Sequence, residues 1–194
     1  MSKWGTSVPR RRKRADGERN RAQLIIAAKN AIAEHGAAVS LDQVSRDAGV
    51  SIATLYRHFP SRDALLQEVY SEEVEALIGT AEQLTADHDP VTALREWLVV
   101  FVEFLNTKRG MADALSTLID GPDALFSETH ARLSSPISAL VARATDTGKF
   151  RIDVEPLDLL RALTGVANVR PDPDWKQSAI HLIDHLIRGA ELER

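Results

Sequence analysis

The sequence predicts an all-α protein of about nine helices, with a small N-terminal helix-turn-helix unit followed by a larger helical body. Helix starts and stops recur along the 194 residues as capping residues, prolines and glycines at helical intervals. Strands of alternating polar and apolar residues between turn signals are not evident. The chain is also long enough to form two units of unequal size.

Four helices are expected in the first part of the chain, over residues 19–35, 41–48, 51–59 and 62–84. Ser40 and Gln43 have the spacing of a capping box for the second of them. Gly49 follows it and can adopt the positive φ that other residues avoid. Ser51 can cap the third helix, and Pro60 blocks its continuation.

Prolines and glycines mark the later helices in the same way. Four starts are expected near Pro90, Pro122, Pro156 and Pro173, and a short helix near residues 111–118. Stops are expected at Gly110, Gly148 and Gly189. Pro136 lies inside an otherwise helical stretch and should kink that helix.

Charge divides the chain into two parts. Residues 1–62 hold 12 Lys and Arg against 5 Asp and Glu, a net charge of +7, whereas residues 63–194 hold 12 against 23, a net charge of −11. A basic end on an acidic body suits a protein that attracts nucleic-acid phosphates at one end only. Arg10–Arg14 supplies most of this asymmetry, so charge by itself is weak support.

The composition excludes several classes of protein. Without Cys the chain has no disulfide, thiolate metal site or thiol nucleophile. The longest strongly apolar stretch, residues 97–102, is too short to span a membrane, and the basic start lacks the apolar run of a secretory signal. We therefore expect a cytoplasmic protein with no membrane partner. Phosphate-binding glycine loops, dinucleotide fingerprints and HExxH motifs are missing from the sequence, so neither an enzyme nor a cofactor is expected.

Residues 40–59, SLDQVSRDAGVSIATLYRHF, are the most informative segment, because they read as two capped short helices around a tight turn. Val50 can fill the angle between the helices, and a unit of this kind places its second helix in a DNA major groove. The stretch AGVSIATLYRHFPSRDALL resembles the signature of the TetR family, and the likeness covers about residues 17–77. It implies an all-helical homodimer that controls transcription from an operator.

The resemblance also implies roles for individual residues. Leu55 and Phe59 correspond to buried positions. Contacts to DNA phosphates are implied for Ser40, Ser51, Thr54, Tyr56, His58 and Arg62. Contacts to base edges are implied for Ile52, Ala53 and Arg57. Ile52 would also suit the apolar stripe of its helix, and ordinary packing at a helix end is the alternative for Tyr56 and His58.

Three regions are expected on this basis: a flexible basic arm over residues 1–16, a DNA-binding domain over 17–62, and an effector-binding and dimerisation domain over 63–194. The arm could reach into an adjacent minor groove or along phosphates, as homeodomain arms do. A solvated tail is an equally good interpretation.

The body contains an expected helix, residues 93–108, that is apolar almost all round and must therefore be surrounded. With neighbouring helices it could line a pocket for a small hydrophobic effector, although a filled core explains any single residue as well. The candidate pocket residues are Trp97, Phe101, Phe104, Met111, Leu115, Leu118, Phe126, His130, Leu133 and Ile137. Candidate polar groups beside His130 are Asn106, Thr129 and Asn168.

Wide apolar stripes on the last two expected helices could form a four-helix bundle with a symmetry mate. The candidate interface residues are Leu159, Leu163, Val166, Ile180, Ile183, Leu186 and Ile187. The same stripes could instead close the core of the monomer. His181 and His185 lie one helical turn apart, but two His on a polar face explain them better than a metal site does.

Together these observations predict a DNA-binding transcriptional regulator, a repressor released from its operator by a small-molecule effector. A dimeric DNA-binding regulator without an effector is the alternative, and a helical-bundle enzyme is a more remote one. We expect double-stranded operator DNA and a second copy of the chain as partners.

Overall fold

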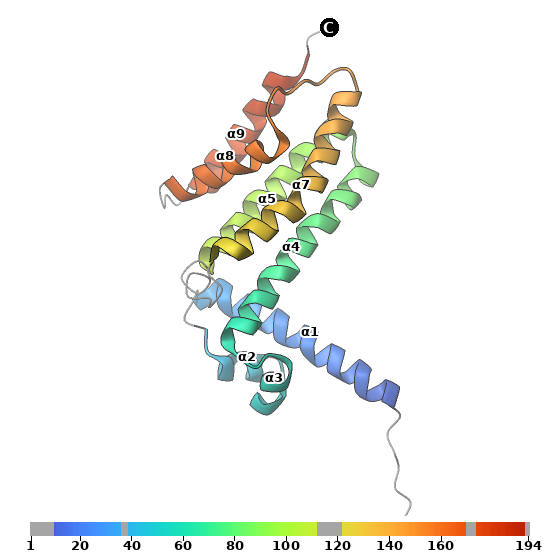
Figure 1. The fold of residues 1–194 in the computed structure, drawn as a ribbon. Coiled ribbons are helices and arrows are strands. Elements are labelled where there is room, and N and C mark those ends of the chain that lie inside the picture. The colour runs from blue at the N-terminus through green and yellow to red at the C-terminus, as the bar shows by residue number, and fades with distance from the viewer. Residues whose placement is uncertain (1–9, 36–38, 112–121, 170–173, 193–194) are drawn as a thin grey trace, which may run out of the picture. The chain divides into compact units, whose positions relative to one another are not determined.

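The computed structural model describes residues 10–35, 39–111, 122–169 and 174–192 (Figure 1). Within these residues it contains eight helices and no strand, which confirms the all-α prediction. The short helix expected near residues 111–118 lies almost wholly outside the described residues. The chain divides into two compact units, residues 1–69 and 70–194. The second unit thus starts seven residues after the expected domain boundary at residue 63.

The first unit contains α1 (Arg10–His35), α2 (Leu41–Asp47), α3 (Ile52–His58) and the first two turns of α4 (Arg62–Asp87). α1, α2 and α3 pack against one another. Each of the four helices contributes apolar side chains to the buried interior, among them Leu24, Ala28, Ile32, Val44, Leu55, Leu65, Leu66 and Val69.

α1 begins at Arg10, nine residues before the expected start at residue 19. The expectation of a flexible arm over residues 1–16 was therefore wrong from Arg10 onward, and residues 1–9 lie outside the described part. Arg, Lys, Ala and Glu are good helix formers, and the single Gly17 costs about 1 kcal/mol relative to Ala. An ion pair between Arg19 and Asp16, 2.8 Å apart and one turn away, adds local support.

A tight turn joins α2 to α3. Gly49 has φ of 67°, as its position in the motif predicts. The backbone N–H of Val50 donates to the carbonyl of Ser45 at 3.0 Å. The Ser51 hydroxyl then caps α3 by accepting a hydrogen bond from the Thr54 N–H at 3.2 Å, also as predicted.

The capping box expected at the start of α2 is absent. Ser40 has the extended backbone of an N-cap residue, but its side chain makes no capping hydrogen bond. The Gln43 amide instead donates to Asp47 at 2.7 Å and accepts from Arg46 at 2.7 Å. These partners lie three and four residues ahead on the same face of α2, and they compete with the backbone for the amide.

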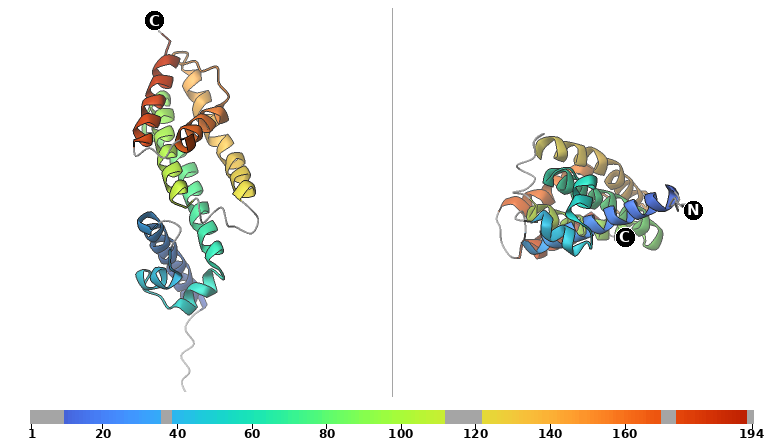
Figure 2. Two further views of the ribbon diagram at one scale, coloured as in Figure 1. Left: turned by 90° about the vertical axis from the view of Figure 1, so that its left-hand side faces the viewer. Right: turned by 90° about the horizontal axis from the view of Figure 1, so that it is seen from below.

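The second unit contains the rest of α4, α5 (Pro90–Gly110), α7 (Pro122–Asp146), α8 (Pro156–Val169) and α9 (Trp175–Ala190). α5 contacts α7, α8 and α9, and α8 packs beside α9 (Figure 2). As expected, Pro90, Pro122 and Pro156 each stand at the first position of a helix. Pro173 lies outside the described residues, and α7 continues through Pro136.

Polar contacts link the helices of this unit at a few points. The indole N–H of Trp97 on α5 donates to the carbonyl of Leu77 on α4 at 2.9 Å. Arg95 on α5 forms an ion pair with Asp184 on α9 at 2.7 Å, and the Arg95 guanidinium holds the pKa of that carboxyl below its usual value. At the end of α9, the Arg151 N–H donates to the carbonyl of Ala190 at 2.8 Å. Polar contacts therefore join α5 to both α4 and α9.

The turn at Gly49 generates a test of this fold. A Cβ added at Gly49 or at Gly79 in α4 would meet nothing within 4 Å, so backbone conformation alone separates the two sites. We expect Gly49→Ala to lower the free energy of unfolding by about 1 to 2 kcal/mol because of its positive φ. Gly79→Ala is the matched control and should raise it by up to about 1 kcal/mol.

Urea titration followed by circular dichroism measures both variants. Equal effects of the two substitutions would contradict the assignment of a left-handed backbone at Gly49.

Candidate nucleic-acid interface and ligand cavity

α3 has one buried face and one exposed face. Leu55 and Phe59 are 0% and 3% exposed and lie in the core of the first unit. Tyr56 is 50% exposed, and Ala53 and Arg57 are exposed beside it. The short helix therefore presents a phenol and a guanidinium to solvent from a rigid base, which is what a helix that enters a DNA groove requires.

Hydrogen bonds along α3 position its polar side chains. The hydroxyls of Ser51 and Thr54 are 2.9 Å apart, and the Arg57 guanidinium donates to the Thr54 hydroxyl at 3.0 Å. In this state Arg57 is held along the helix surface rather than pointing away from it. Because this hydrogen bond is exposed, it can be exchanged for a stronger one to an acceptor on a ligand.

All nine residues expected to contact DNA keep some exposure to solvent. The exposed members are Ser40, Ser51, Ala53, Tyr56 and Arg57. The half-buried members are Ile52, Thr54, His58 and Arg62. The partial exposure of Ile52 fits both of its interpretations, since it borders the core and the open face alike. Their roles in DNA binding stay predictions.

Arg21 on α1 is a supporting residue that sequence reasoning missed. Its guanidinium lies 5.4 Å from the centre of the Phe59 ring and forms an ion pair of 2.6 Å with Glu68 on α4. It thereby holds the end of α3 between two longer helices. No local pattern indicates this role, because Phe59 and Glu68 are far from Arg21 in the sequence.

The second unit contains a small cavity of about 10 Å³, roughly the space of one water molecule. The residues that line it are Tyr70, Phe101, Phe104, Leu105, Lys108, Thr129, His130, Leu133 and Thr164. They come from α4, α5, α7 and α8. The cavity is therefore a meeting point of four helices.

Burial shapes the chemistry of the polar groups around the cavity. The Thr129 hydroxyl donates to the Tyr70 hydroxyl at 3.1 Å, and both residues are buried. Burial raises the pKa of Tyr70 despite this hydrogen bond and the nearby Arg132. Burial lowers the pKa of Lys108. Burial also lowers the pKa of His130, and the positive charges of Lys108 and Arg161 lower it further.

The structure brings together only part of the expected pocket. Phe101, Phe104, His130 and Leu133 line the cavity. Trp97, Met111 and Ile137 are buried but do not line it. Leu115 and Leu118 lie outside the described residues, as does the side chain of Phe126. Asn106 and Asn168 are exposed and do not line the cavity either, whereas Thr129 does.

Tyr70, Leu105, Lys108 and Thr164 line the cavity without having been expected there. Lys108 lies in the last turn of α5, where a cation has an ordinary explanation in the helix dipole. Its position one turn after Phe104 was the available signal, because residues four apart share a helix face.

Two family models match the chain. Residues 24–69 match the model described as bacterial regulatory proteins of the tetR family. Residues 89–191, more than half of the chain, match the model described as the C-terminal domain of SbtR-like transcriptional regulators. The chain belongs to the TetR family.

Individual relatives agree with this TetR assignment. The solved structure of the TetR transcriptional regulator SCO0520 from Streptomyces coelicolor is 32% identical, with a TM-score of 0.77 over 90% of this chain and 99% of that one. The HTH-type transcriptional regulator SAR0097 of Staphylococcus aureus strain MRSA252 is 28% identical over 50% of this chain and 52% of its own length.

A protein of Escherichia coli strain K12 named as a probable acrEF/envCD operon repressor is 30% identical over 49% of this chain and 44% of its own length. The chain thus spans about half the length of the curated relatives it matches. The family is one of transcriptional regulators.

The residues expected in the dimer interface of this TetR-family chain fall into two groups. Leu159, Leu163, Ile183 and Ile187 are buried within the protomer. They close the monomer's own core, which is the alternative that the sequence leaves open. Val166, Ile180 and Leu186 are half-buried, so part of each side chain is still available to a second copy.

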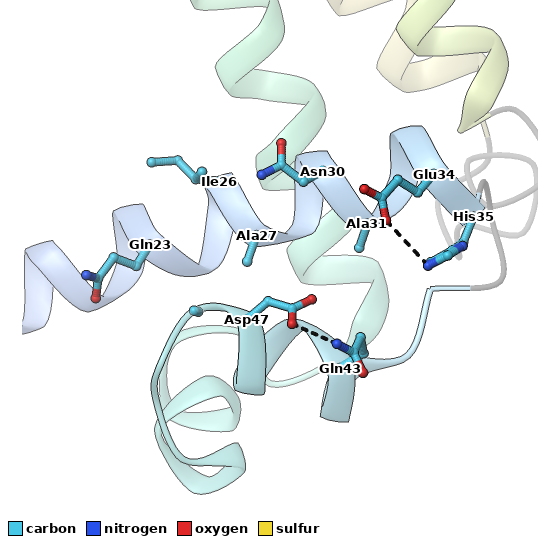
Figure 3. Close-up of a pocket in the computed structure, with 10 residues that line it drawn as sticks. Gln23, Ile26, Ala27, Asn30, Ala31, Glu34, His35, Gln43 and Asp47 are labelled. Carbon is cyan, nitrogen blue, oxygen red and sulfur yellow. Dashed lines mark hydrogen bonds and ion pairs between the residues drawn. The ribbon is translucent and has the colours of Figure 1, made fainter.

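A groove of about 510 Å³ lies between α1 and α2 in the first unit. Figure 3 shows polar side chains along it, including Gln23, Asn30 and Glu34 of α1 and Gln43 and Asp47 of α2. Among the described residues its lining has no aromatic ring except the His35 imidazole, and its apolar surface comes from alanines and Ile26. Small-molecule sites are mostly lined by apolar and aromatic side chains, so the much smaller cavity of the second unit, with Phe101, Phe104 and Leu133 in its wall, has the better chemistry for a ligand.

Neither a membrane-crossing helix nor a metal-binding group of three His, Asp or Glu is found over residues 10–35, 39–111, 122–169 and 174–192. His181 and His185 are exposed on α9. The first lies 2.9 Å from the Gln177 amide, and the ring of the second lies 2.7 Å from the carbonyl of His181.

Arg21 provides a test of how α3 is held. We expect Arg21→Ala to lower the free energy of unfolding of the first unit by about 1 to 2 kcal/mol. The exposed ion pair contributes less than about 1 kcal/mol, and the cation over the Phe59 ring a similar amount. Arg19→Ala is the control, because among the described residues the Arg19 side chain makes only an exposed pair within α1, and its effect should stay within about 0.5 kcal/mol.

Amide hydrogen exchange on α3 reads out the result by residue. If α3 exchanged at the same rate in the Arg21→Ala variant and in the unaltered chain, Arg21 would have no part in fastening this helix.

Proposed function

We propose that this chain is a DNA-binding transcriptional repressor that acts as a homodimer and leaves its operator when a small molecule binds in the second unit. The observation that carries the proposal is the exposed face of α3, where Tyr56 and Arg57 stand outward while Leu55 and Phe59 anchor the helix.

In the proposed complex, α3 enters the major groove. Arg57 reads guanine O6 and N7, and Ile52 and Ala53 meet thymine methyl groups. Phosphate contacts come from the hydroxyl, imidazole and guanidinium groups of the six other predicted residues, namely Ser40, Ser51, Thr54, Tyr56, His58 and Arg62. The net charge of +7 over residues 1–62 supports this orientation.

A homodimer carries two DNA-binding units, each with its own α3. A helix-turn-helix dimer binds two half-sites about one helical turn of DNA apart, so the distance between its recognition helices decides whether it fits. Val166, Ile180 and Leu186 are the surface of α8 and α9 through which a second copy would pack. A symmetric interface uses the same patch on both copies.

Repression is the default because the relatives include a protein named as an operon repressor. Another relative is named a transcriptional activator, so an experiment must decide between repression and activation. A regulator without an effector is the second candidate. The cavity volume of about 10 Å³ favours it, since the described conformation has no room for more than a water molecule.

DNA recognition is tested with Arg57→Ala combined with Tyr56→Phe. A random duplex pool selected on the unaltered chain supplies the DNA, and fluorescence anisotropy measures affinity at fixed salt. We expect the double variant to lose retention of the selected duplex. Arg57 accounts for roughly a 5- to 150-fold loss, because a good Arg–guanine pair is worth about 1 to 3 kcal/mol of discrimination.

Arg151→Ala is the control. Arg151 is likewise an exposed arginine, but it lies in the second unit and contacts only Asp153 through its side chain among the described residues. Tight DNA binding by the double variant with unchanged circular dichroism would overturn the proposed role of α3.

The basic start of α1 is tested through its salt dependence. Replacing Arg10, Arg11, Arg12, Lys13 and Arg14 by Gln keeps helix propensity and removes charge. We expect weaker binding to the selected duplex. The slope of log affinity against log salt should also become shallower by about 0.9 for each lost phosphate contact. As a control, replacing Lys149 and Arg151 by Gln should change neither the affinity for the duplex nor its salt slope. An unaltered slope in the five-residue variant would exclude phosphate contacts by this segment.

A further inference from the structure

Ser51, Thr54 and Arg57 form a chain of hydrogen bonds along α3. The Ser51 hydroxyl accepts from the Thr54 N–H at 3.2 Å, and the two hydroxyl oxygens are 2.9 Å apart. The Arg57 guanidinium donates to the Thr54 hydroxyl at 3.0 Å. Thr54 thus connects the residue that caps the helix to the residue that is proposed to read a base. A phosphate contact by Thr54 alone does not require this arrangement.

We propose that Thr54 is a positioning residue for base recognition: its hydroxyl stays bonded to Arg57 in the DNA complex and directs the guanidinium toward one guanine. This inference rests on the proposed function, in which Arg57 reads guanine O6 and N7. It adds to that function a residue that determines how sharply this guanine is distinguished from other bases.

The guanidinium has enough donors for both partners. Arginine carries five N–H groups in a planar fork, and a bidentate contact with guanine uses two of them. The bond from Arg57 to Thr54 uses one, so it can be kept when a guanine is bound. A fixed point on the fork also limits the directions in which the other N–H groups point. This preorganisation lowers the conformational entropy that is lost on binding.

Thr54 can serve as a support because its own side chain is restrained. Its β-branched side chain has few allowed χ1 rotamers, and it is half-buried on α3. Ser51 beside it is fixed as the N-cap of the helix, and the neighbouring Leu55 is buried in the core of the first unit. The position of the Thr54 hydroxyl is therefore set by the helix before any DNA is bound.

The two hydroxyls also keep a proton for the DNA backbone. Each hydroxyl has one O–H to donate and two lone pairs with which to accept. Either Ser51 or Thr54 donates to the other across their contact of 2.9 Å, so one O–H of the pair remains. This O–H can be donated to a phosphate, as in the proposed function, while Arg57 stays bonded to Thr54.

A neutral partner suits an arginine that reads DNA. Arg21 in the same unit pairs with the carboxylate of Glu68 at 2.6 Å. Arg57 is held by a hydroxyl, which does not neutralise the positive charge that strengthens a hydrogen bond to a base. A carboxylate in the place of this hydroxyl would compete with the base for the guanidinium and would repel nearby phosphates.

Thr54→Val tests the inference, because it removes the hydroxyl but keeps the β-branched shape and the N–H that Ser51 caps. Fluorescence anisotropy at fixed salt measures binding of the full chain to the duplex selected on the unaltered chain. It also measures binding to copies in which single guanines are replaced by 7-deazaguanine, which lacks the N7 acceptor. The guanine read by Arg57 is the one whose replacement weakens binding by the unaltered chain but not by Arg57→Ala.

The readout is the ratio of the affinity for the guanine duplex to that for the 7-deazaguanine duplex at this position. We expect Thr54→Val to reduce the ratio by roughly 2- to 10-fold, which corresponds to the net contribution of one hydrogen bond. Thr54→Ser should restore the ratio. In the Arg57→Ala background, Thr54→Val should not weaken binding further, because no guanidinium is left to position.

Thr80→Val is the matched control. Thr80 is also a half-buried threonine on a helix, and its hydroxyl donates to the carbonyl of Ala76 on α4 at 2.8 Å. This variant should change neither the affinity nor the ratio. Circular dichroism verifies that each variant folds, and Thr54→Ala, which favours the helix, is a second variant with the same expected loss of discrimination.

An unchanged ratio in Thr54→Val would overturn the inference, because loss of a phosphate contact weakens binding to both duplexes by the same factor. A larger ratio would overturn it as well, since Arg57 would then have to leave Thr54 in order to bind. Arg57→Ala reads out the proposed function separately. If that variant loses the preference for guanine while Thr54→Val keeps it, the proposed function stands without a role for Thr54. If the unaltered chain prefers no guanine, the base contact of Arg57 and the inference fail together.

Discussion

The burial of Leu55 and Phe59 is the contact on which the proposed recognition surface depends. A helix of seven residues is too short to be stable by its own hydrogen bonds, so α3 exists because these two side chains are packed in the core of the first unit. Since successive helical residues are about 100° apart, the same packing turns Tyr56 and Arg57 outward. Stability and orientation thus come from one set of contacts, and the left-handed Gly49 sets where α3 begins relative to α2.

The sequence predicted this motif well because its determinants are local. The Ser51 cap, the Gly49 turn and the stop after α3 each depend on residues within one turn of each other. The prediction failed where side chains had several partners to choose from. Gln43 bonds along its helix instead of capping it, and Arg21 reaches Phe59 and Glu68 from another helix. The early start of α1 was missed because a run of cations was read as a tail, although its residues are good helix formers.

In the second unit the sequence predicted that α5 is buried, but not which of its faces borders a cavity. On a helix that is apolar all round, the sequence pattern does not show which aromatic side chains point toward a cavity and which point into the core. The indole N–H of Trp97 donates to the Leu77 carbonyl, and this side chain belongs to the core. Phe101 and Phe104 instead line the cavity. Lys108 is more instructive, because a cation near a helix end has an ordinary explanation in the helix dipole. Only the three-dimensional arrangement shows that Lys108 also lines the cavity together with His130.

α4 offers a physical route from the cavity to the DNA-binding unit. Val69 is buried in the first unit, and the next residue, Tyr70, lines the cavity and accepts a hydrogen bond from Thr129. A ligand that separates the aromatic side chains of the cavity, and so expands it, must displace Tyr70 or its neighbours, and losing that hydrogen bond costs about 0.5 to 1.5 kcal/mol. This cost is subtracted from the affinity of the ligand. In the proposed mechanism the ligand overcomes this cost only through its preference for the expanded state, and by linkage that preference sets how far the ligand weakens DNA binding. A tightly closed cavity is therefore compatible with a strong switch, because a ligand that fits both states equally would shift nothing.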